Sequence, residues 1–561
     1  MRTTLLTMTA ALATAAALLA PNTADACGGF FCAQAAPVMQ TAERILFMQL
    51  DENTIETHVQ ISYTGPSEDF AWIVPTPSQP VLSLGSDTVF QSLDLLGPPI
   101  QILQGETVGT CRQDDRQFGD TSTVDFGADA GSDAGTGGGV DVIALETVGP
   151  FDTAIIQATA VEPMMEWLDT NGYDLPPQTA ALLSPYVEGD MYFLALKLTK
   201  DASAGDLQPI AMTYNAPAPM IPIQLTAIAA ADDMPIQTWI VGDQYAAPAN
   251  YAEVEPDPIS VVTNGWNSSA RAAVDSLAER SMARTFADES APLAAGFYNT
   301  SYEDDIASLR QQETANQLYD RLVSGTLGFV LQTSPLSLPI YQFCAPMPER
   351  LVEDGFAAAN FYSCPECFLE SEDEWTTPGA DACADYVDER FLEPLRRIAG
   401  YFEELRTASR FDTWLDAAEM DLDPMFCWDG DLQARETLSV TRTRYCRDDL
   451  YAWEAPDRID VDGLSFFPNE NGTYSGRAPV ASITRHGCAQ GDTDVEVPTG
   501  AQTRALVAQR SRASFEGWFG NLDEDNMPAP ARQESSACAA SGAAGAWWML
   551  MLVPVALRRR R

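Results

Sequence analysis

Eleven cysteines restrict the folds open to this chain more than any other feature of its sequence. Cys538 stands apart in a tail of small and apolar residues, and the others form an even set that can pair completely. In a chain that leaves the cytosol, an even set predicts a disulfide framework, although spacing leaves the pairing open. The candidate disulfide cysteines are Cys27, Cys32, Cys111, Cys344, Cys364, Cys367, Cys383, Cys427, Cys446 and Cys488.

The N-terminal residues 1–26 have the layout of a secretory signal peptide. A basic residue precedes an apolar stretch over 5–20, and the small-residue site Ala24-Asp25-Ala26 stands directly before Cys27. We expect cleavage after Ala26, which places the rest of the chain outside the cytosol. Lipid modification of Cys27 is the alternative route of processing.

The C-terminal tail predicts a membrane segment. Residues 539–557 are mostly apolar and as a helix would span roughly 28 Å, close to the thickness of a bilayer core. The four arginines at 558–561 would stay in the cytoplasm, with the bulk of the chain on the other side. Cys538, the apolar run and the arginines together resemble the MYXO-CTERM sorting signals. That resemblance implies cleavage near Cys538, a lipid on this cysteine and display on the cell surface, whereas an ordinary transmembrane helix is the alternative.

The chain is strongly acidic, with 80 acidic and 32 basic residues and a net charge of −48. Such a surface repels phosphate backbones and anionic lipid headgroups, so nucleic-acid binding is excluded as a function class. A solvated acidic exterior explains the charge without a ligand, and binding of divalent cations or basic partners is the alternative.

The first half of the chain predicts β-structure. Residues 45–50 and 55–63 read as a hairpin whose second strand turns His58 toward a polar face, where we expect it to be exposed or half-exposed. Residues 70–74 predict a strand at a sheet edge, because prolines follow them. Further strands are expected at 191–198, 207–214, 221–229 and 236–241.

Helices are expected between and after these strands. Residues 161–168 predict one helix, Ser301 with Asp304 predicts a capping box for a helix ending at Gly325, and Pro394 suits the first turn of another. We expect an α+β fold with a β-sandwich-like N-terminal half, a helical middle and a disulfide-rich, irregular C-terminal part. The expected organisation is a signal peptide at 1–26, a β-rich domain at 27–262, a helical, cysteine-containing region at 263–450, an irregular region at 451–533 and a spacer with the sorting or transmembrane segment at 534–561.

Several short motifs, in this order, resemble the bacterial domain-of-unknown-function family 2330. They are Cys27-Gly28-Gly29-Phe30-Phe31-Cys32, Ala42-Glu43-Arg44-Ile45, Phe70-Ala71-Trp72-Ile73-Val74-Pro75, Val148-Gly149-Pro150-Phe151-Asp152, Leu207-Gln208-Pro209-Ile210 and Met420-Asp421-Leu422-Asp423-Pro424-Met425-Phe426. The resemblance runs from Cys27 to about Cys446 and implies an exported bacterial protein with no catalytic residue to carry over.

The sequence contains little that indicates catalysis. His58 and His486 are its only histidines and lie on distant segments, so they form no zinc-binding pair. The common nucleotide-binding and hydrolase motifs are absent. Cys364-Pro365-Glu366-Cys367 has the spacing of a redox pair, but acidic and loop residues follow it, so a structural disulfide is favoured over a thiol-disulfide site.

Calcium binding is a further hypothesis. Four aspartates lie close together in sequence and could converge on a cation; they are Asp421, Asp423, Asp429 and Asp431. No complete calcium loop accompanies them.

Together these observations favour an exported, surface-anchored protein that is non-catalytic and takes part in cell-envelope interactions or structure. The sequence implies no cofactor and no resident metal, and its partner, an envelope or extracellular protein, is not identified. An extracytoplasmic thiol oxidoreductase using Cys364 and Cys367 and a calcium-dependent adhesin are the alternatives.

Overall fold

The computed structural model describes the chain in segments from Met39 onward. The described residues are 39–64, 71–94, 100–112, 141–173, 176, 178–198, 208–289, 298–331, 337–371, 374–404, 407–432, 438–447, 451, 454–461, 464–468, 480–488, 493–495 and 512. The chain forms two compact units. The larger unit comprises Met1–Gln101, Asp120–Leu438 and Ala478–Gly500, and the smaller unit comprises Ile102–Gly119, Ser439–Arg477 and Ala501–Arg561.

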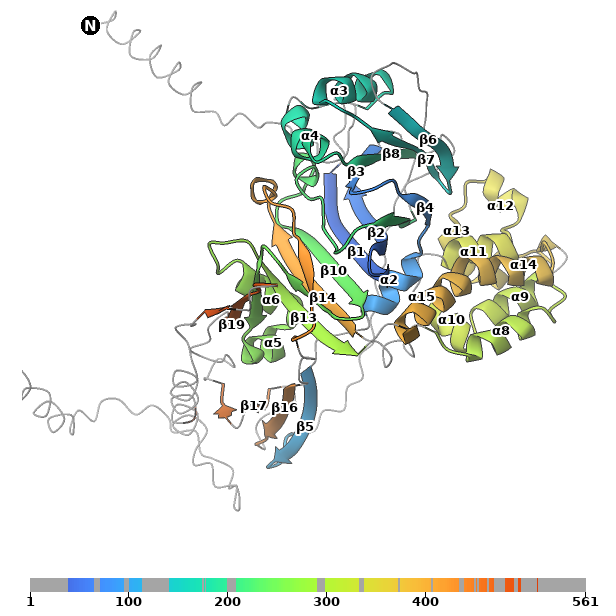
Figure 1. Cartoon of the computed structure of the whole chain (residues 1–561). Coiled ribbons are helices and arrows are strands. Elements are labelled where there is room, and N and C mark those ends of the chain that lie inside the picture. Colours follow the sequence, from blue (N-terminus) through green and yellow to red (C-terminus); the bar gives the residue numbers. More distant parts are fainter. Residues whose placement is uncertain are drawn as a thin grey trace, which may run out of the picture. The chain divides into compact units, whose positions relative to one another are not determined.

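A ten-stranded mixed sheet runs through the larger unit (Figure 1). Its strands are β1 (Met39–Asp51), β2 (Thr54–Thr64), β4 (Val81–Leu84), β9 (Ile210–Asn215), β10 (Met234–Gly242), β12 (Ala252–Pro256), β13 (Ser281–Glu289), β14 (Thr407–Leu415), β19 (Val480–Arg485) and β20 (Thr493–Val495). Their order is β20-β19-β12-β13-β14-β10-β1-β2-β9-β4. β1 pairs antiparallel with β2 and parallel with β10, so the centre of the sheet joins segments far apart in sequence.

A second, antiparallel sheet packs on one face of the large sheet. Its strands are β3 (Ala71–Thr76), β6 (Asp141–Val148), β7 (Phe151–Gln157) and β8 (Tyr192–Leu198), in the order β3-β8-β7-β6. Ile45 and Phe47 of β1 share one buried cluster with Trp72 of β3 and Leu196 of β8. Successive side chains of a strand point to opposite faces, so alternate residues of β1 build this contact.

Helices cover the opposite face of the large sheet. Leu46 and Met48 of β1 and Trp239 of β10 share a buried cluster with them. These helices are α2 (Asp87–Asp94), α8 (Ser301–Leu309), α9 (Ala315–Leu322), α10 (Gly325–Leu331), α11 (Ser337–Cys344), α12 (Glu349–Glu353), α13 (Ala358–Ser363), α14 (Ala380–Val387) and α15 (Glu393–Glu404). Figure 1 shows α8 to α15 gathered into one helical group.

Two helix pairs cover the remaining sheet surfaces. α3 (Val161–Thr170) and α4 (Thr179–Glu188) pack on the outer face of the four-stranded sheet. α5 (Pro258–Asn264) and α6 (Trp266–Val274) pack beside β12 and β13. The larger unit therefore has helices, large sheet, small sheet and helices as successive layers.

The smaller unit contains a four-stranded sheet of β5 (Ile100–Val108), β16 (Leu438–Tyr445), β17 (Asp457–Val461) and β18 (Leu464–Phe466). A disulfide joins Cys111 to Cys446, and the Cys446 amide donates a 2.7 Å hydrogen bond to the Val108 carbonyl. The bridge closes a span of 335 residues, which links two distant parts of the sequence in one small unit.

The structure confirms the α+β class, the sheet-rich first half with its two packed sheets, and the helical middle. The expected strand at 221–229 is wrong. This segment is a loop that ends in a 3-10 turn, η3 (Thr226–Ile228), and its apolar side chains Ile221, Ile223 and Leu225 are buried without pairing in a sheet.

The helix expected from Ser301 to Gly325 is two helices, α8 and α9. Thr314 interrupts it, because its hydroxyl accepts from the Gln317 amide while the Gln317 side chain accepts from the Thr314 amide. The capping box therefore forms at Thr314 and not at Ser301, whose amide donates to Asn299 Oδ1. α9 ends at Leu322, and Gly325, whose φ is +74°, is the first residue of α10 and not the residue that ends the preceding helix.

Among the described residues, no helix has the length and apolar character needed to cross a membrane. The predicted signal peptide and the predicted tail segment at 534–561 lie outside these residues.

Candidate functional site

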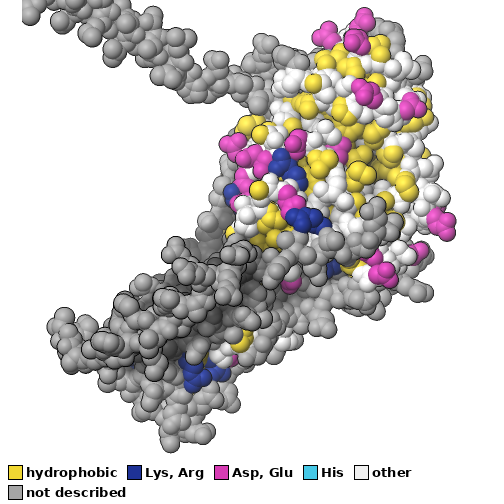
Figure 2. Space-filling model, turned by 60° about the vertical axis from the view of Figure 1, so that its left-hand side comes forward, with side chains coloured by type: hydrophobic (Ala, Val, Ile, Leu, Met, Phe, Trp, Pro, Cys, Tyr) yellow, Lys and Arg dark blue, Asp and Glu magenta, His cyan; other side chains and the backbone are white. Residues whose placement is uncertain are grey.

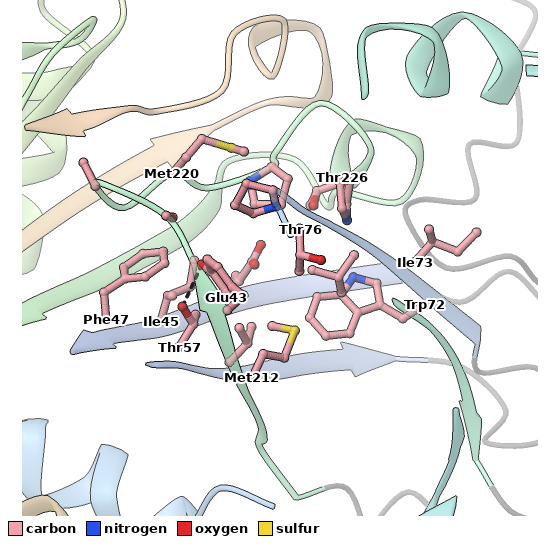
Figure 3. Close-up of a pocket in the computed structure, with 18 residues that line it drawn as sticks. Glu43, Ile45, Phe47, Thr57, Trp72, Ile73, Thr76, Met212, Met220 and Thr226 are labelled. Carbon is pink, nitrogen blue, oxygen red and sulfur yellow. Dashed lines mark hydrogen bonds between the residues drawn. The ribbon is translucent and has the colours of Figure 1, made fainter. Parts of the chain in front are cut away.

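A pocket lies between the two packed sheets of the larger unit (Figure 3). Its volume is about 580 Å³ including the open mouth. Strands β1, β2 and β9 form one wall, β3 forms the other, and the segment that leads from β9 to η3 closes one side. The lining residues are Glu43, Ile45, Phe47, Thr57, Val59, Trp72, Ile73, Val74, Pro75, Thr76, Pro77, Met212, Tyr214, Ala216, Ala218, Met220, Pro222 and Thr226.

The pairing of the strands explains which side chains meet here. Phe47 of β1 lies opposite Thr57 of β2, and Thr57 lies opposite Met212 of β9, so these three residues form one row across the sheet. Glu43 and Phe47 are separated by an even number of positions in β1. Because alternate residues of a strand point to the same face, the Glu43 and Phe47 side chains share a face. An acidic residue thus stands on a strand face that is otherwise apolar.

Glu43 is the electrostatic centre of the pocket. Its side chain is 5% exposed and accepts a 3.0 Å hydrogen bond from Gln40 Nε2. Burial raises the pKa of Glu43 to about 7, although the hydrogen bond from Gln40 acts in the opposite direction. The carboxyl can therefore change its charge near neutral pH.

Most other polar groups of the pocket already have partners. The hydroxyls of Thr57 and Tyr214 are 2.8 Å apart and bond to each other, and the Thr76 hydroxyl donates to the Ser78 carbonyl. Burial raises the pKa of Tyr214 to about 12, so this phenol stays neutral. The pocket thus offers a ligand apolar surface, one carboxyl group, the indole N–H of Trp72 and the hydroxyl of Thr226.

The lining of the pocket is mostly apolar. Among the described residues that line the pocket there is no cysteine, serine, histidine, lysine or arginine. Nucleophilic catalysis needs a nucleophile that is activated by an adjacent base. The hydroxyls of Thr57 and Thr76 bond to Tyr214 and to the Ser78 carbonyl, and not to Glu43. A concave, mostly apolar site with a single well-placed polar group is typical of a small-molecule binding site.

Eight of the predicted cysteines form four disulfides, and they do not meet at one site. The pairs are Cys111 with Cys446, Cys344 with Cys383, Cys364 with Cys367, and Cys427 with Cys488. Cys27, Cys32, Ala26 and Cys538 lie outside the described residues.

The Cys364–Cys367 pair lies on a turn that follows the C-terminal end of α13 and forms η4 (Pro365–Cys367). Cys367 is exposed, whereas Cys344 and Cys383 are fully buried. A redox pair gains thiolate stability from the N-terminus of a helix, and this turn follows a helix end of the opposite polarity.

The prediction that His58 is exposed is wrong, because it is 1% exposed. The polar face of β2 is covered by the helical layer, and α15 places Arg397 beside Glu56 at 2.8 Å. His486 is also buried and its Nε2 lies 2.8 Å from Glu253 Oε2. Both histidines therefore take part in internal clusters with a buried glutamate.

The aspartates considered for calcium have partners within the protein. Asp423 accepts from the Tyr186 hydroxyl at 2.9 Å and from the Gln224 amide at 3.0 Å, and Asp421 pairs with Arg280. Asp429 accepts from the amide of Asp431. No group of three or more possible metal ligands occurs in the described parts of the chain.

Sequence reasoning did not identify Glu43 or Trp72 as site residues. A signal was nevertheless present, because two of the motifs quoted above, 42–45 and 70–75, contribute six of the pocket residues. Only the packing of one sheet on the other brings these two motifs together.

The residues that line the pocket lie within a segment of the chain that matches a protein family. The family model described as "Uncharacterized protein conserved in bacteria (DUF2330)" matches residues 21–301, a range that includes every residue lining the pocket. The segment 420–426 lies outside the match.

The comparisons with curated proteins and with solved structures do not establish a further relationship. No curated protein matches the chain. The crystal structure of baculovirus P35 is similar over 38% of this chain and 67% of that chain, at 11% identity and a TM-score of 0.21, which does not establish a shared fold. The family match extends over half of the sequence, and the chain therefore belongs to the DUF2330 family of uncharacterized proteins conserved in bacteria.

Proposed function

We propose that this protein is an exported, surface-anchored, non-catalytic binding protein, and that the pocket between its two sheets is its binding site. One observation carries the proposal: an apolar pocket holds a buried carboxyl, Glu43, and no nucleophile or second acid-base group except a hydrogen-bonded tyrosine among its described lining residues.

Export is supported by the two ends of the sequence and by the cysteines. Disulfides form and persist mainly in oxidising compartments, and eight cysteines pair in the described residues. The signal-peptide layout of 1–26 and the arginine-terminated tail support an extracytoplasmic location, with anchoring through Cys538 or the tail. The acidic surface favours solubility of an exposed protein, and Figure 2 shows carboxylates spread over one described face with a few basic side chains among them.

The binding site is tested with an uncharged apolar dye, N-phenyl-1-naphthylamine, whose fluorescence rises in an apolar pocket. We expect the full-length protein to bind it. Ala218→Trp places a large ring at the pocket lining and is expected to weaken binding by about tenfold or more, a loss of about 1.4 kcal/mol. Asn215→Trp is the matched control, since Asn215 is exposed and does not line the pocket.

Equal dye binding by the wild type and Ala218→Trp, with both variants folded by circular dichroism, would refute this pocket as the site. The location is tested separately, by treating intact cells with protease and following the chain with an antibody. Loss of the full-length band supports surface display, whereas complete protection until the cells are lysed contradicts it.

A second candidate function, thiol-disulfide exchange, is favoured by the exposure of Cys367. A partner thiolate would attack Cys367 Sγ, break its bond to Cys364, and leave a mixed disulfide and a Cys364 thiolate. A second partner thiol would then displace Cys367, leaving the partner oxidised and this pair reduced. Cys364→Ser removes the bridge, so in this variant the free Cys367 thiolate would attack the disulfide of an oxidised partner, the reverse of the last step, and stay joined to it because no Cys364 thiol remains to release it. The absence of any trapped protein, with dye binding intact, favours the binding function.

A further inference from the structure

Among the described residues the carboxyl group of Glu43 has no cationic partner, whereas three other buried carboxylates each pair with an arginine. Glu56 pairs with Arg397 at 2.8 Å, Glu253 pairs with Arg284 at 2.9 Å, and Asp412 pairs with Arg410 at 3.1 Å. A buried carboxylate is costly unless it is paired, and these three follow that rule. Glu43 has one hydrogen bond, from the neutral amide of Gln40.

Aromatic and sulfur-containing side chains surround the position that a cation would take. Phe47, Trp72 and Tyr214 line the pocket with Met212. Figure 3 shows Glu43 in the middle of the lining residues, with Phe47 on one side of it and Trp72 on the other. The faces of aromatic rings attract organic cations, and the attraction grows when water is excluded.

The walls of the pocket are poor in hydrogen-bond donors. Pro75, Pro77 and Pro222 have no backbone N–H, and the hydroxyls of Thr57 and Thr76 already have partners within the protein. The indole N–H of Trp72 and the hydroxyl of Thr226 are the other side-chain donors of the lining besides Tyr214. A ligand that needs donors, such as a carboxylate or a phosphate, would find few here. A ligand that carries N–H donors and positive charge matches the carboxyl.

The charge of the whole molecule acts in the same direction. With a net charge of −48, the protein attracts cations to its surface and repels anions. Long-range attraction and the local carboxyl therefore select the same sign of ligand charge.

We propose that the pocket binds an organic cation, whose ammonium group pairs with Glu43 and whose apolar body packs among Phe47, Trp72 and Met212. This inference rests on the proposed function, because it assigns a ligand class to the same pocket. Glu43 then acts as the group that selects the ligand, and the apolar walls set the size and shape that fit.

The experiment compares phenethylammonium with 2-phenylethanol, which has the same ring and chain but no charge. Isothermal titration of the wild type at pH 8 is expected to show at least about tenfold tighter binding of the ammonium, a difference of about 1.4 kcal/mol. Glu43→Gln keeps the shape of the side chain and removes its charge, so the preference is expected to disappear while binding of the alcohol persists.

The pH profile gives an independent readout. Of the described residues that line the pocket, only Glu43 and Tyr214 titrate, and the pKa of Tyr214 lies far above the range tested. Phenethylammonium keeps its charge between pH 5.5 and 8, because its pKa, like that of a lysine side chain, is about 10. Its affinity is therefore expected to fall as the pH drops through the pKa of Glu43, about 7, while that of the alcohol stays level.

The possible failures are distinguishable. If the wild type and Glu43→Gln each bind both ligands equally, and Ala218→Trp abolishes this binding in either protein, the organic cation is overturned as the ligand. The pocket is then kept as the binding site. Binding that Ala218→Trp leaves unchanged, or no binding of either ligand or of the dye, overturns both proposals.

Discussion

His58 Nε2 lies 2.7 Å from Glu56 Oε1, and both side chains project from the same face of β2 into the layer beneath α15. Arg397 of α15 completes the cluster with a 2.8 Å contact to the same oxygen, and the Tyr401 hydroxyl donates to Glu56 Oε2 at 3.3 Å. Burial alone would raise the pKa of Glu56, but the hydrogen bond and charge of His58 and the charge of Arg397 lower it overall. The cluster therefore ties the helical layer to the large sheet through a charged carboxylate.

Replacement of Arg397 is expected to destabilise the protein. Arg397→Gln would leave the buried carboxylate of Glu56 without its guanidinium, and the expected cost is about 1–3 kcal/mol in the free energy of unfolding. The measurement is urea denaturation of both proteins at pH 7.5. The control is Arg396→Gln at the adjacent position of α15. Its partners Glu303, Glu393 and Asp388 are exposed by 52%, 62% and 37%, so its loss is expected to stay below about 1 kcal/mol. A larger loss for Arg396→Gln would contradict the role given to the cluster.

Titration of His58 is expected to destabilise the fold in acid. Burial lowers the pKa of His58 below its ordinary value of 6.5, and the nearby Arg397 acts in the same direction, while Glu56 opposes them. As the pH falls, the unfolded chain therefore binds a proton at His58 at a higher pH than the folded protein does. The stability that comes from keeping His58 neutral is complete above pH 6.5 and is lost as the pH falls below this value. His58→Gln should lose less stability than the wild type between pH 7.5 and pH 5, measured by urea denaturation at each pH. Parallel curves for the two proteins would show that His58 does not titrate in this way.

The titration of Glu43 is expected to change the free energy of unfolding in the opposite direction, with stability lost as the pH rises. Its pKa of about 7 in the folded protein is above the ordinary value of 4.5, because burial disfavours the charged form. The folded state keeps this proton while the unfolded state loses it, so the wild type loses stability as the pH rises from 4.5 to 7.

Glu43→Gln removes that loss. The variant is expected to gain stability relative to the wild type as the pH rises from 4.5, with a relative gain that approaches about 3 kcal/mol at pH 8, measured by urea denaturation. Glu52→Gln in the exposed turn of the β1–β2 hairpin is the control and should leave the pH dependence unchanged. A constant difference between Glu43→Gln and the wild type across this range would refute a buried, titrating carboxyl.

The disulfides are expected to differ in their contribution to stability. Cys344 and Cys383 are 39 positions apart, whereas Cys364 and Cys367 are 3 positions apart. Because the entropy that a bridge removes from the unfolded chain grows with loop length, the double replacement Cys344→Ala/Cys383→Ala should cost about 4 kcal/mol and Cys364→Ala/Cys367→Ala about 2 kcal/mol. Chemical denaturation of the two variants checks the order, and a larger cost for the short bridge would contradict it.

Local sequence patterns determined several elements of this fold. The apolar run at 45–50 and the alternation at 55–63 predict the β1–β2 hairpin, and the spacing of Leu395, Ile398 and Phe402 after Pro394 predicts α15. These signals can be read because hydrophobic periodicity is local. The prediction failed at 221–229, where apolar residues are buried in a loop, because burial alone does not specify strand pairing.

The tertiary structure alone decided the candidate site. Glu43 and Trp72 lie in different strands of different sheets, and the β9 residues that complete the pocket are more than a hundred positions further along the chain. The sequence determined the hairpin of 45–50 and 55–63 and an even set of cysteines apart from Cys538. It could not determine that the polar face of β2 is covered by α15 or which cysteines pair. The physical reason is that periodicity assigns a side chain to a face of its own strand, whereas what covers that face depends on long-range packing.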